Sequence, residues 1–145
     1  MKTKTAILIA EDDPDDRLLV QEALRESKFE NPIFFVKDGE ELLDYLYQRG
    51  KFSPPTAPHR PGLILLDLNM PRKDGREALA EIKTNAKLRS IPIVVLSTTD
   101  ATADIRQSYQ LGANSFITKP SSFKGLVNAM RAIRRYWFKI VKLPG

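Results

Sequence analysis

The sequence contains no cysteine and a single histidine. Without cysteine the chain can form no disulfide bond and has no thiol chemistry, a composition that suits a reducing compartment. The histidine, His59, falls in the Pro-rich segment 49–62 (RGKFSPPTAPHRPG), which we expect to form the longest loop. We assign it no catalytic role, so any functional site must be built from other side chains.

Long hydrophobic runs are also missing. No stretch approaches the ~20 apolar residues of a membrane-spanning helix. The run from Ala6 to Ala10 is too short for the apolar region of a signal peptide, and it stops at the acidic residues 11–13. We therefore expect a cytoplasmic protein without membrane contact. At 145 residues the chain is long enough for one domain with a hydrophobic core of its own.

Acidic residues are absent from the C-terminal part of the chain. Residues 1–104 contain 15 Lys and Arg and all 18 Asp and Glu, whereas residues 105–145 contain eight Lys and Arg and no acid. A basic segment suits nucleic acid or an acidic protein surface, but it is also typical of a solvated helix face. Charge alone therefore does not decide the function.

Short apolar segments alternate with longer amphipathic ones along the whole chain. The expected strands are 5–10, 32–36, 63–66, 92–96 and 115–118. The expected helices are 14–27, 39–48, 75–86, 101–111 and 122–141. Five strands alternating with five helices predict an α/β fold whose parallel sheet is covered by helices on both faces. The first helix has a clear start, with Asp13 as N-cap and Pro14 at the first helical position.

Chemically active side chains follow four of the expected strands. They are Glu11, Asp12 and Asp13 after the first strand, Asp67 after the third, Ser97 after the fourth and Lys119 after the fifth. The carboxyl-terminal ends of parallel strands lie along one edge of the sheet, where ligands bind in such folds. Each residue alone has an ordinary explanation as a helix cap, a turn residue, a strand-end hydroxyl or a solvated charge. Their occurrence at four matching strand ends favours a functional site.

The residue types in this group indicate a particular chemistry. Clustered carboxylates repel one another and need a cation, and oxygen ligands without His or Cys suit Mg²⁺. A lysine beside the metal completes a site for a phosphoryl group, because the charge is then neutralised from both sides. Asp67 can act there as the nucleophile that forms an acyl phosphate. This would explain why the buried run Leu63–Leu66 ends on a carboxylate.

Four motifs extend this hypothesis to a family. The segments LIAEDD, LLDLNMPRKDG, VVLST and SFITKP, in this order and spacing, resemble the receiver domains of two-component response regulators. The resemblance runs from about residue 5 to residue 136. It implies a doubly wound, five-stranded parallel sheet in the order 2-1-3-4-5, as in flavodoxin-like folds. It also implies a signalling protein, not an enzyme, that takes a phosphoryl group from a sensor histidine kinase.

The resemblance assigns roles to the acidic residues. Asp67 would be the phosphoacceptor. Asp12, Asp67 and the main-chain carbonyl of Asn69 would bind Mg²⁺ directly, and Glu11 would hold a metal-bound water. Slow loss of the phosphoryl group would be the only hydrolysis.

The resemblance also implies a switch on the other side of the acceptor. Ser97 would be the hydroxyl that moves to the phosphoryl group, and Lys119 would be the ion-pair partner of that group. Phe116 would be the aromatic ring that turns inward when Ser97 shifts. The family usually has Thr and often Tyr at these two positions, and the substitutions keep the hydroxyl and the ring. The Lys119–Pro120 peptide bond would be cis.

Less constrained segments narrow the resemblance. DGEELLDYLYQRGKF, the Pro-rich loop, DGREALAEIK and RYWFKIVKLPG are similar to regulators paired with bacterial and cyanobacterial phytochromes. We therefore expect a phytochrome histidine kinase as partner. We also expect one receiver domain over residues 1–145, with a core of about 5–136 and a C-terminal extension over 137–145. A DNA-binding output domain has no room after the receiver, so we expect output through the receiver surface or a partner.

The last expected helix carries an apolar stripe that continues beyond the core. Up to Ile133 a 3.6-residue period predicts burial against the sheet. Beyond it the stripe and its flanks comprise Tyr136, Trp137, Phe138, Ile140 and Val141. Two further helical turns of aromatic surface would lie exposed on a monomer, and such patches usually mark an interface. We therefore expect a homodimer formed by the fourth and fifth helices and the fifth strand.

Two other functions fit parts of the sequence. A Mg²⁺-dependent phosphohydrolase would need an acid two residues after its nucleophile, and this chain has Asn69 there. A nucleic-acid binder could use the basic residues of the last helix, but no DNA-reading motif accompanies them. We regard both as weaker hypotheses than a phosphoacceptor.

Overall fold

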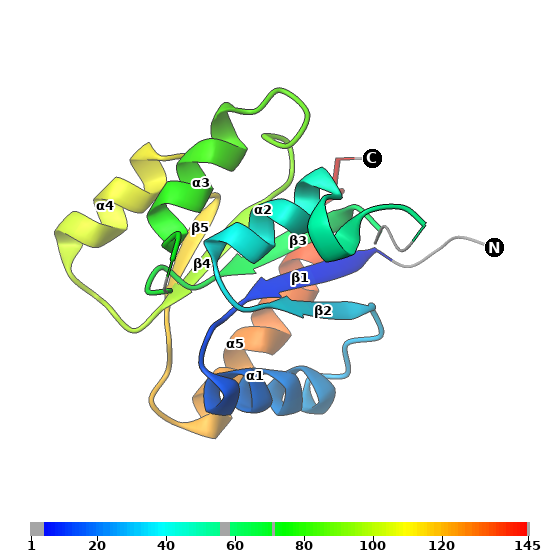
Figure 1. The fold of residues 1–145 in the computed structure, drawn as a ribbon. Coiled ribbons are helices and arrows are strands. Elements are labelled where there is room, and N and C mark those ends of the chain that lie inside the picture. The colour runs from blue at the N-terminus through cyan, green and yellow to red at the C-terminus, as the bar shows by residue number, and fades with distance from the viewer. Residues whose placement is uncertain (1–4, 56–58, 71, 145) are drawn as a thin grey trace.

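The computed structural model describes residues 5–55, 59–70 and 72–144. Residues 1–4, residues 56–58 of the expected loop, Pro71 of the second motif and Gly145 lie outside these ranges. Five parallel strands form one sheet in the order β2-β1-β3-β4-β5 (Figure 1). The strands are β1 (Ala6–Ala10), β2 (Ile33–Val36), β3 (Pro61–Leu66), β4 (Ile93–Ser97) and β5 (Ser115–Thr118). The expected α/β class and strand order are confirmed.

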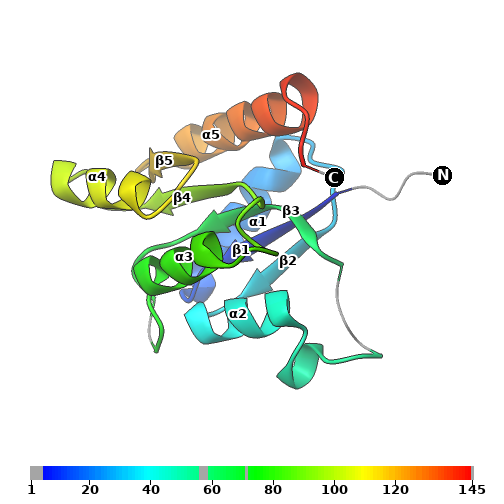
Figure 2. The same cartoon turned by 90° about the horizontal axis from the view of Figure 1, so that it is seen from above.

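Helices cover both faces of the sheet, as Figures 1 and 2 show. They are α1 (Pro14–Glu26), α2 (Gly39–Tyr47), α3 (Gly75–Thr84), α4 (Thr102–Gln110) and α5 (Phe123–Arg135), with a short 3₁₀ turn at Gly50–Phe52. Helices α1 and α5 pack together on one face, and α2 and α3 pack together on the other, with α4 beside α3. No helix in the described part of the chain is long and apolar enough to cross a membrane.

The two layers of helices create two hydrophobic clusters, one on each face of the sheet. Ile7 and Ile9 point to the α1 and α5 side and pack in the same cluster as Met130, whereas Leu8 points to the α2 and α3 side with Ile82. Successive residues of a strand face opposite ways, so a strand covered on both faces must be apolar throughout. The buried strands β1, β3 and β4 thus hold a rigid edge at their carboxyl-terminal ends.

The end of the fifth helix differs from its prediction. α5 is followed by a π-helical turn, Tyr136–Ile140, instead of continuing as an α-helix to Val141. Trp137 and Phe138 are half-buried and pack against the cluster between the sheet and the α1–α5 layer. The Phe138 ring lies edge-on to Phe29, with 5.8 Å between ring centroids. A π turn is wider than an α turn, so side chains leave the 3.6-residue pattern and these two aromatic rings fold back onto their own chain.

The expected exposed aromatic surface is therefore smaller than predicted. In this segment Tyr136 and Ile140 are exposed, with 51% and 59% of their surface accessible. Val141 is half-buried. The expectation of two fully exposed turns is wrong for Trp137 and Phe138, and it holds for Tyr136 and Ile140.

The Lys119–Pro120 peptide bond also departs from expectation. It is trans, and within the described ranges the cis bond is Pro54–Pro55. The trans form is the lower-energy isomer of an X-Pro bond, and the chain makes its turn here without the cis form. The Lys119 N–H donates to the Ser97 carbonyl at 2.7 Å, and α5 starts three residues after Pro120 with Ser122 as its N-cap.

Candidate functional site

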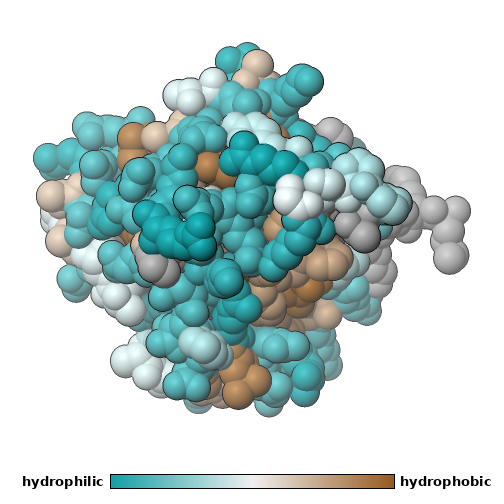
Figure 3. Space-filling view, in the orientation of Figure 1, coloured by the Kyte–Doolittle hydropathy of each residue, from teal (hydrophilic) through white to brown (hydrophobic). Residues whose placement is uncertain are grey.

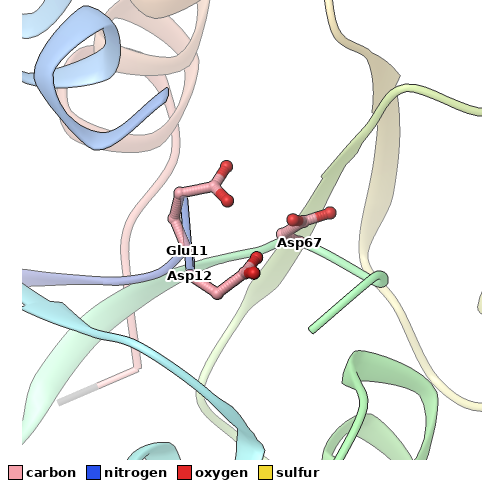
Figure 4. Close-up of side chains that lie close together, drawn as sticks. All are labelled: Glu11, Asp12 and Asp67. Atoms are coloured by element: carbon pink, nitrogen blue, oxygen red, sulfur yellow. The ribbon is translucent and has the colours of Figure 1, made fainter. Parts of the chain in front are cut away.

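The acidic side chains are placed by the ends of the two central strands. The Glu11 N–H donates to the Val36 carbonyl at 2.9 Å, and the Asp67 N–H donates to the Ala10 carbonyl at 3.1 Å. These main-chain bonds continue the β-sheet ladder one residue past the ends of β1 and β3. Carboxylate oxygens of Glu11, Asp12 and Asp67 lie within 4.8 Å of one another, and Figure 4 shows the three side chains around a common space.

Asp67 lies at the centre of this cluster and is buried. Burial is the main cause that raises its pKa, from 3.8 to about 7, and the charge of Glu11 raises it further. The charge of Lys119 and the Asn69 N–H, which donates to Asp67 Oδ1 at 3.2 Å, act in the opposite direction. Without a cation the three acids therefore repel one another, and Asp67 holds a proton more readily than a free aspartate does.

Lys119 reaches the cluster from the end of β5. Its ammonium forms a short ion pair with Glu11 and a second contact with Asp16 Oδ2 at 3.4 Å. Burial lowers the pKa of Lys119, but the hydrogen bond to Glu11 and the charges of Asp67, Glu11 and Asp16 outweigh burial and raise it. Lys119 is therefore a cation at the edge of the acidic cluster, held on the side of Glu11.

Two residues of α1 that sequence reasoning did not single out also contact the cluster. Asp16 shares the Lys119 ammonium, and Arg17 donates from Nε to the Glu11 carbonyl at 2.8 Å while its guanidinium lies over the Phe35 ring at 5.6 Å. Asp13 caps α1, as expected, by accepting from the N–H groups of Asp15 and Asp16. Because Asp13 is exposed and engaged with the helix, the metal-sized cluster contains its two predecessors and not Asp13 itself.

Ser97 lies on the opposite side of Asp67, at the end of β4. It is fully buried, and its Oγ accepts a long hydrogen bond of 3.4 Å from the Thr99 N–H. The Thr99 hydroxyl donates to Asp104 Oδ2 at 3.0 Å, and Arg76 reaches Asp104 Oδ1 at 3.4 Å. A continuous polar chain thus connects the Ser97 hydroxyl with the start of α4 and the first turn of α3.

Phe116, in the middle of β5, is half-buried against the cluster on the α2 and α3 side. Its N–H donates to the Tyr109 hydroxyl of α4 at 3.1 Å. β5 is an edge strand, and this hydroxyl satisfies a main-chain donor that β4 does not pair. Tyr109 therefore connects α4 to the residue expected to act as the switch aromatic.

A glycine allows the loop after Asp67 to close tightly. A Cβ added to Gly75 would lie 2.3 Å from the Asp67 carbonyl oxygen, and the Gly75 N–H donates to the Leu68 carbonyl at 2.9 Å. A side chain at position 75 would push the start of α3 away from the acceptor. The glycine in the motif KDG is thus required for close approach of the main chain.

The donor set of the cluster suits a divalent cation. Three carboxylates converge, and no cysteine or histidine takes part. Hard divalent ions take oxygen ligands of this kind. A cation bound there would also lower the pKa of Asp67, which burial and then the charge of Glu11 raise. The arrangement of acids on one side, a buried hydroxyl on the other and a lysine at the rim can hold a phosphoryl group on Asp67.

Comparison with known proteins places this site in a family. The family model of the response regulator receiver domain matches residues 7–131. Response regulator Rcp1 of Synechocystis sp. is 43% identical over 138 residues, which cover 95% of this chain and 92% of Rcp1. The chain belongs to the response regulator receiver family, whose members signal through phosphorylation of the receiver domain.

Solved structures give the same assignment. The phosphorylated cyanobacterial phytochrome response regulator RcpA aligns with a TM-score of 0.89 and 42% identity, covering 98% of this chain and 99% of RcpA. The Mn²⁺-bound form of Rcp1 aligns with a TM-score of 0.88 and 41% identity, covering 97% and 99% of the two chains. The chain is thus a response regulator related to phytochrome response regulators, and Rcp1, a relative of the same fold, binds a divalent metal.

Proposed function

We propose that Asp67 accepts a phosphoryl group from a phosphohistidine of a sensor histidine kinase. An Asp67 carboxylate oxygen forms the new bond to phosphorus, the P–N bond of the donor breaks, and the imidazole nitrogen leaves with a proton. The convergence of Glu11, Asp12 and Lys119 on Asp67 is the observation that supports this role. Lys119 would move from Glu11 toward the transferred oxygens and balance their charge.

Mg²⁺ is the cation we propose for the acidic cluster. Asp12, Asp67 and the Asn69 main-chain carbonyl would hold it, and Glu11 would hold it through a water. When bound, Mg²⁺ supplies positive charge to the phosphoryl oxygens. The fit is supported by the all-oxygen donors within 4.8 Å of one another and by the Asn69 N–H, whose bond to Asp67 brings the Asn69 main chain beside the cluster.

The switch proposal concerns Ser97 and Phe116. The Ser97 hydroxyl would hydrogen-bond a phosphoryl oxygen, and Thr99, whose N–H is bound to it, would follow. Phe116 is half-buried against the cluster on the α2 and α3 side, and its ring would turn further inward when Ser97 moves. The chain Ser97–Thr99–Asp104 would then carry the change to α4.

Phosphorylation by a small donor tests the acceptor directly. We expect incubation with acetyl phosphate and Mg²⁺ to add the mass of one phosphoryl group to the parent protein and none to Asp67→Asn. Chelation of Mg²⁺ with EDTA should abolish the addition. A phosphoryl group found on Asp67→Asn, or none on the parent with Mg²⁺ present, would refute the assignment.

We propose that the kinase docks beside the site on α1. Leu18 and Leu19 are exposed, with 57% and 47% of their surface accessible. Leu19 lies one helical turn after Asp16, so it faces the same side of α1 as the residue that contacts Lys119. The face in Figure 3 is mostly hydrophilic, and one of its separate hydrophobic areas lies over α1. Exposed apolar residues next to an acceptor suit a partner helix.

The docking proposal predicts different effects on two donors. We expect Leu19→Ala to lower the rate of transfer from a phytochrome kinase by about tenfold while leaving phosphorylation by acetyl phosphate within about twofold, because the small donor needs no helix surface. Leu18→Ala tests the other side of the same surface. Equal losses with both donors would show that Leu19 affects the site and not docking.

The kinase as donor also implies a cytoplasmic location.

Dimerisation stays a proposal, supported by a smaller surface than the sequence suggested. Tyr136 and Ile140 are exposed, and a groove of about 450 Å³ beside them is lined by Ile117, Ile133 and Trp137 among others. A second copy would cover these residues. Because residues 105–145 carry no acid, two such faces repel, and we expect the dimer to strengthen as salt rises. Sedimentation of the parent and of Tyr136→Ser/Ile140→Ser at low and high salt tests it, and identical mass throughout would contradict it.

The two alternative functions are not favoured by the family assignment. The matched family model is that of the response regulator receiver domain, a signalling domain. Basic side chains of α5, such as Lys124 and Arg131, are exposed, but exposure of charge is ordinary for a surface helix.

A further inference from the structure

We propose that Asp16 is a positioning residue that holds Lys119 in a second place, away from the acidic cluster, while a metal ion occupies it. Lys119 Nζ is shared between Glu11 and Asp16, which lies 3.4 Å away on the first turn of α1. The inference rests on the proposed role of Asp67 and deepens it. It concerns the lysine's position before and during phosphoryl transfer.

The two carboxylates that share Lys119 differ in their surroundings. The Glu11 side chain is almost fully buried, whereas the Asp16 side chain is 42% exposed. The Lys119 side chain, 12% exposed, lies between them. The Asp16 main chain is held at the start of α1, because its N–H donates to the Asp13 cap at 3.2 Å. Asp16 therefore offers Lys119 a second carboxylate at the more exposed rim of the site.

A bound metal ion and the Lys119 ammonium would compete for Glu11, and Asp16 offers the ammonium another carboxylate. The acids that converge on the metal position are Glu11, Asp12 and Asp67, and Glu11 is also the closest partner of Lys119. A cation at that position and the ammonium repel each other, and both need Glu11. Moving Lys119 toward Asp16 frees Glu11 without leaving a half-buried ammonium unpaired, which would carry a large desolvation penalty.

The Asp16 carboxylate opposes the next step. To balance charge on a phosphoryl group, Lys119 must move from Asp16 toward Asp67. Asp16 thus assists metal binding and restrains the lysine during capture of an anionic donor. Loss of the Asp16 charge should therefore weaken Mg²⁺ binding and improve the use of acetyl phosphate, two effects of opposite sign.

Asp15 provides a matched control for this test. It precedes Asp16 in the same helical turn, is exposed, and its N–H donates to the same Asp13 cap at 2.8 Å. Changing either residue to Asn removes one negative charge from the start of α1 and the same interaction with the helix dipole. Asp16 contacts Lys119, so only its replacement tests that contact.

The first measurement is Mg²⁺ affinity by calorimetry on the full chain, without any phosphodonor. We expect Asp16→Asn to raise the dissociation constant about two- to fivefold more than Asp15→Asn does, the range of an exposed ion pair. In a Lys119→Met background the two variants should have equal effects, because no ammonium remains to be held. Equal dissociation constants for Asp16→Asn and Asp15→Asn in the Lys119 protein would overturn the proposal.

The second measurement is phosphorylation by acetyl phosphate at saturating Mg²⁺. We expect Asp16→Asn to halve, or lower further, the half-saturating concentration relative to Asp15→Asn, with a smaller change in maximal rate. An equal or higher half-saturating concentration would overturn the second role of Asp16. If the parent protein takes no phosphoryl group, the proposed function of Asp67 fails, and the Mg²⁺ measurement still decides whether Asp16 holds Lys119.

Discussion

The edge of the sheet around Asp67 and the C-terminal segment 136–141 are stabilised in opposite ways. At the sheet edge three carboxylates meet, and burial raises the pKa of Asp67 to about 7. In the C-terminal segment Phe138 packs edge-on against Phe29, and Trp137 joins the core of the α1–α5 side. The first region holds buried carboxylates whose charge a cation can neutralise, whereas the second adds packing to the fold.

The difference shows which part of the chain can hold a destabilising group such as a buried carboxylate. Asp67 follows a strand buried on both faces, so the surrounding sheet can hold a destabilising group in place. Residues 136–141 follow the last helix and have no strand to hold them, so they stay in place only through their own side-chain contacts. Removing the charge of Asp67 should therefore raise the free energy of unfolding, whereas removing side-chain contacts in residues 136–141 should lower it.

The largest expected effect concerns the charge of Asp67. Its pKa is raised from 3.8 to about 7 in the fold, so the folded state binds the extra proton between these values. Stability from this group is full below about pH 4 and is lost as pH rises through about 7. Without Mg²⁺, Asp67→Asn should therefore be more stable than the parent at about pH 8, by up to ~4 kcal/mol, with the gain vanishing near pH 4.

Urea unfolding in EDTA across this pH range measures the difference. Asp100→Asn, at an exposed loop residue, serves as the control and should track the parent. A variant Asp67→Asn that is less stable than the parent at about pH 8 would show that burial and the charge of Glu11 do not destabilise the Asp67 carboxylate.

The next effect concerns the loop that closes on Asp67. We expect Gly75→Ala to lower the free energy of unfolding by about 3 kcal/mol, because the added methyl group would overlap the Asp67 carbonyl oxygen and the Leu68 main chain. It should also slow phosphorylation by acetyl phosphate. Chemical denaturation and intact mass measure the two effects. A loss below about 0.5 kcal/mol would mean that the loop can move aside without penalty.

A pair of changes in the C-terminal segment sharpens the other side of the comparison. Phe138→Ala should lower the free energy of unfolding by about 2 kcal/mol, because it removes the ring that packs on Phe29. Ile140→Ala, at a residue 59% exposed, should change it by less than about 0.5 kcal/mol. The comparison uses urea unfolding at low protein concentration. If Ile140→Ala lowered the free energy of unfolding more than Phe138→Ala, the segment would instead be a continuous helix with its aromatic residues exposed.

The smallest effect concerns β5, which connects the two regions. Tyr109→Phe removes the hydroxyl that accepts from the Phe116 N–H. We expect a loss of about 1 kcal/mol and faster hydrogen exchange of the Phe116 amide, because that donor then faces water. The exchange of amides in β1 should not change. Unchanged exchange at Phe116 would mean that Tyr109 does not hold the strand.

Much of the fold could be predicted because its determinants are local. The apolar runs and their spacing gave all five strands and the starts of the helices within about two residues. The Asp13–Pro14 pair marked the start of α1 correctly. The convergence of Asp12, Asp67 and Lys119 followed from topology, because parallel strands place their carboxyl-terminal ends together.

Other features depend on geometry that no sequence pattern expresses. The contact of Lys119 with Asp16 joins residues 103 positions apart, and the position of Asp16 depends on the cap that Asp13 forms. The fold-back of Phe138 depends on one π turn, and a uniform helical period cannot show it. The Tyr109 hydroxyl finds Phe116 only because β5 is an edge strand beside α4.

The main chain on either side of Asp67 has a consequence for how information leaves the site. The Asp67 N–H donates to the Ala10 carbonyl, and the Leu68 carbonyl accepts from the Gly75 N–H, so main-chain hydrogen bonds hold the segment before and after the acceptor side chain. When Asp67 is modified, these hydrogen bonds therefore oppose any movement of the main chain beside it. We expect the response in the neighbouring β4–α4 connection, where Thr98 and Asp100 are exposed to solvent.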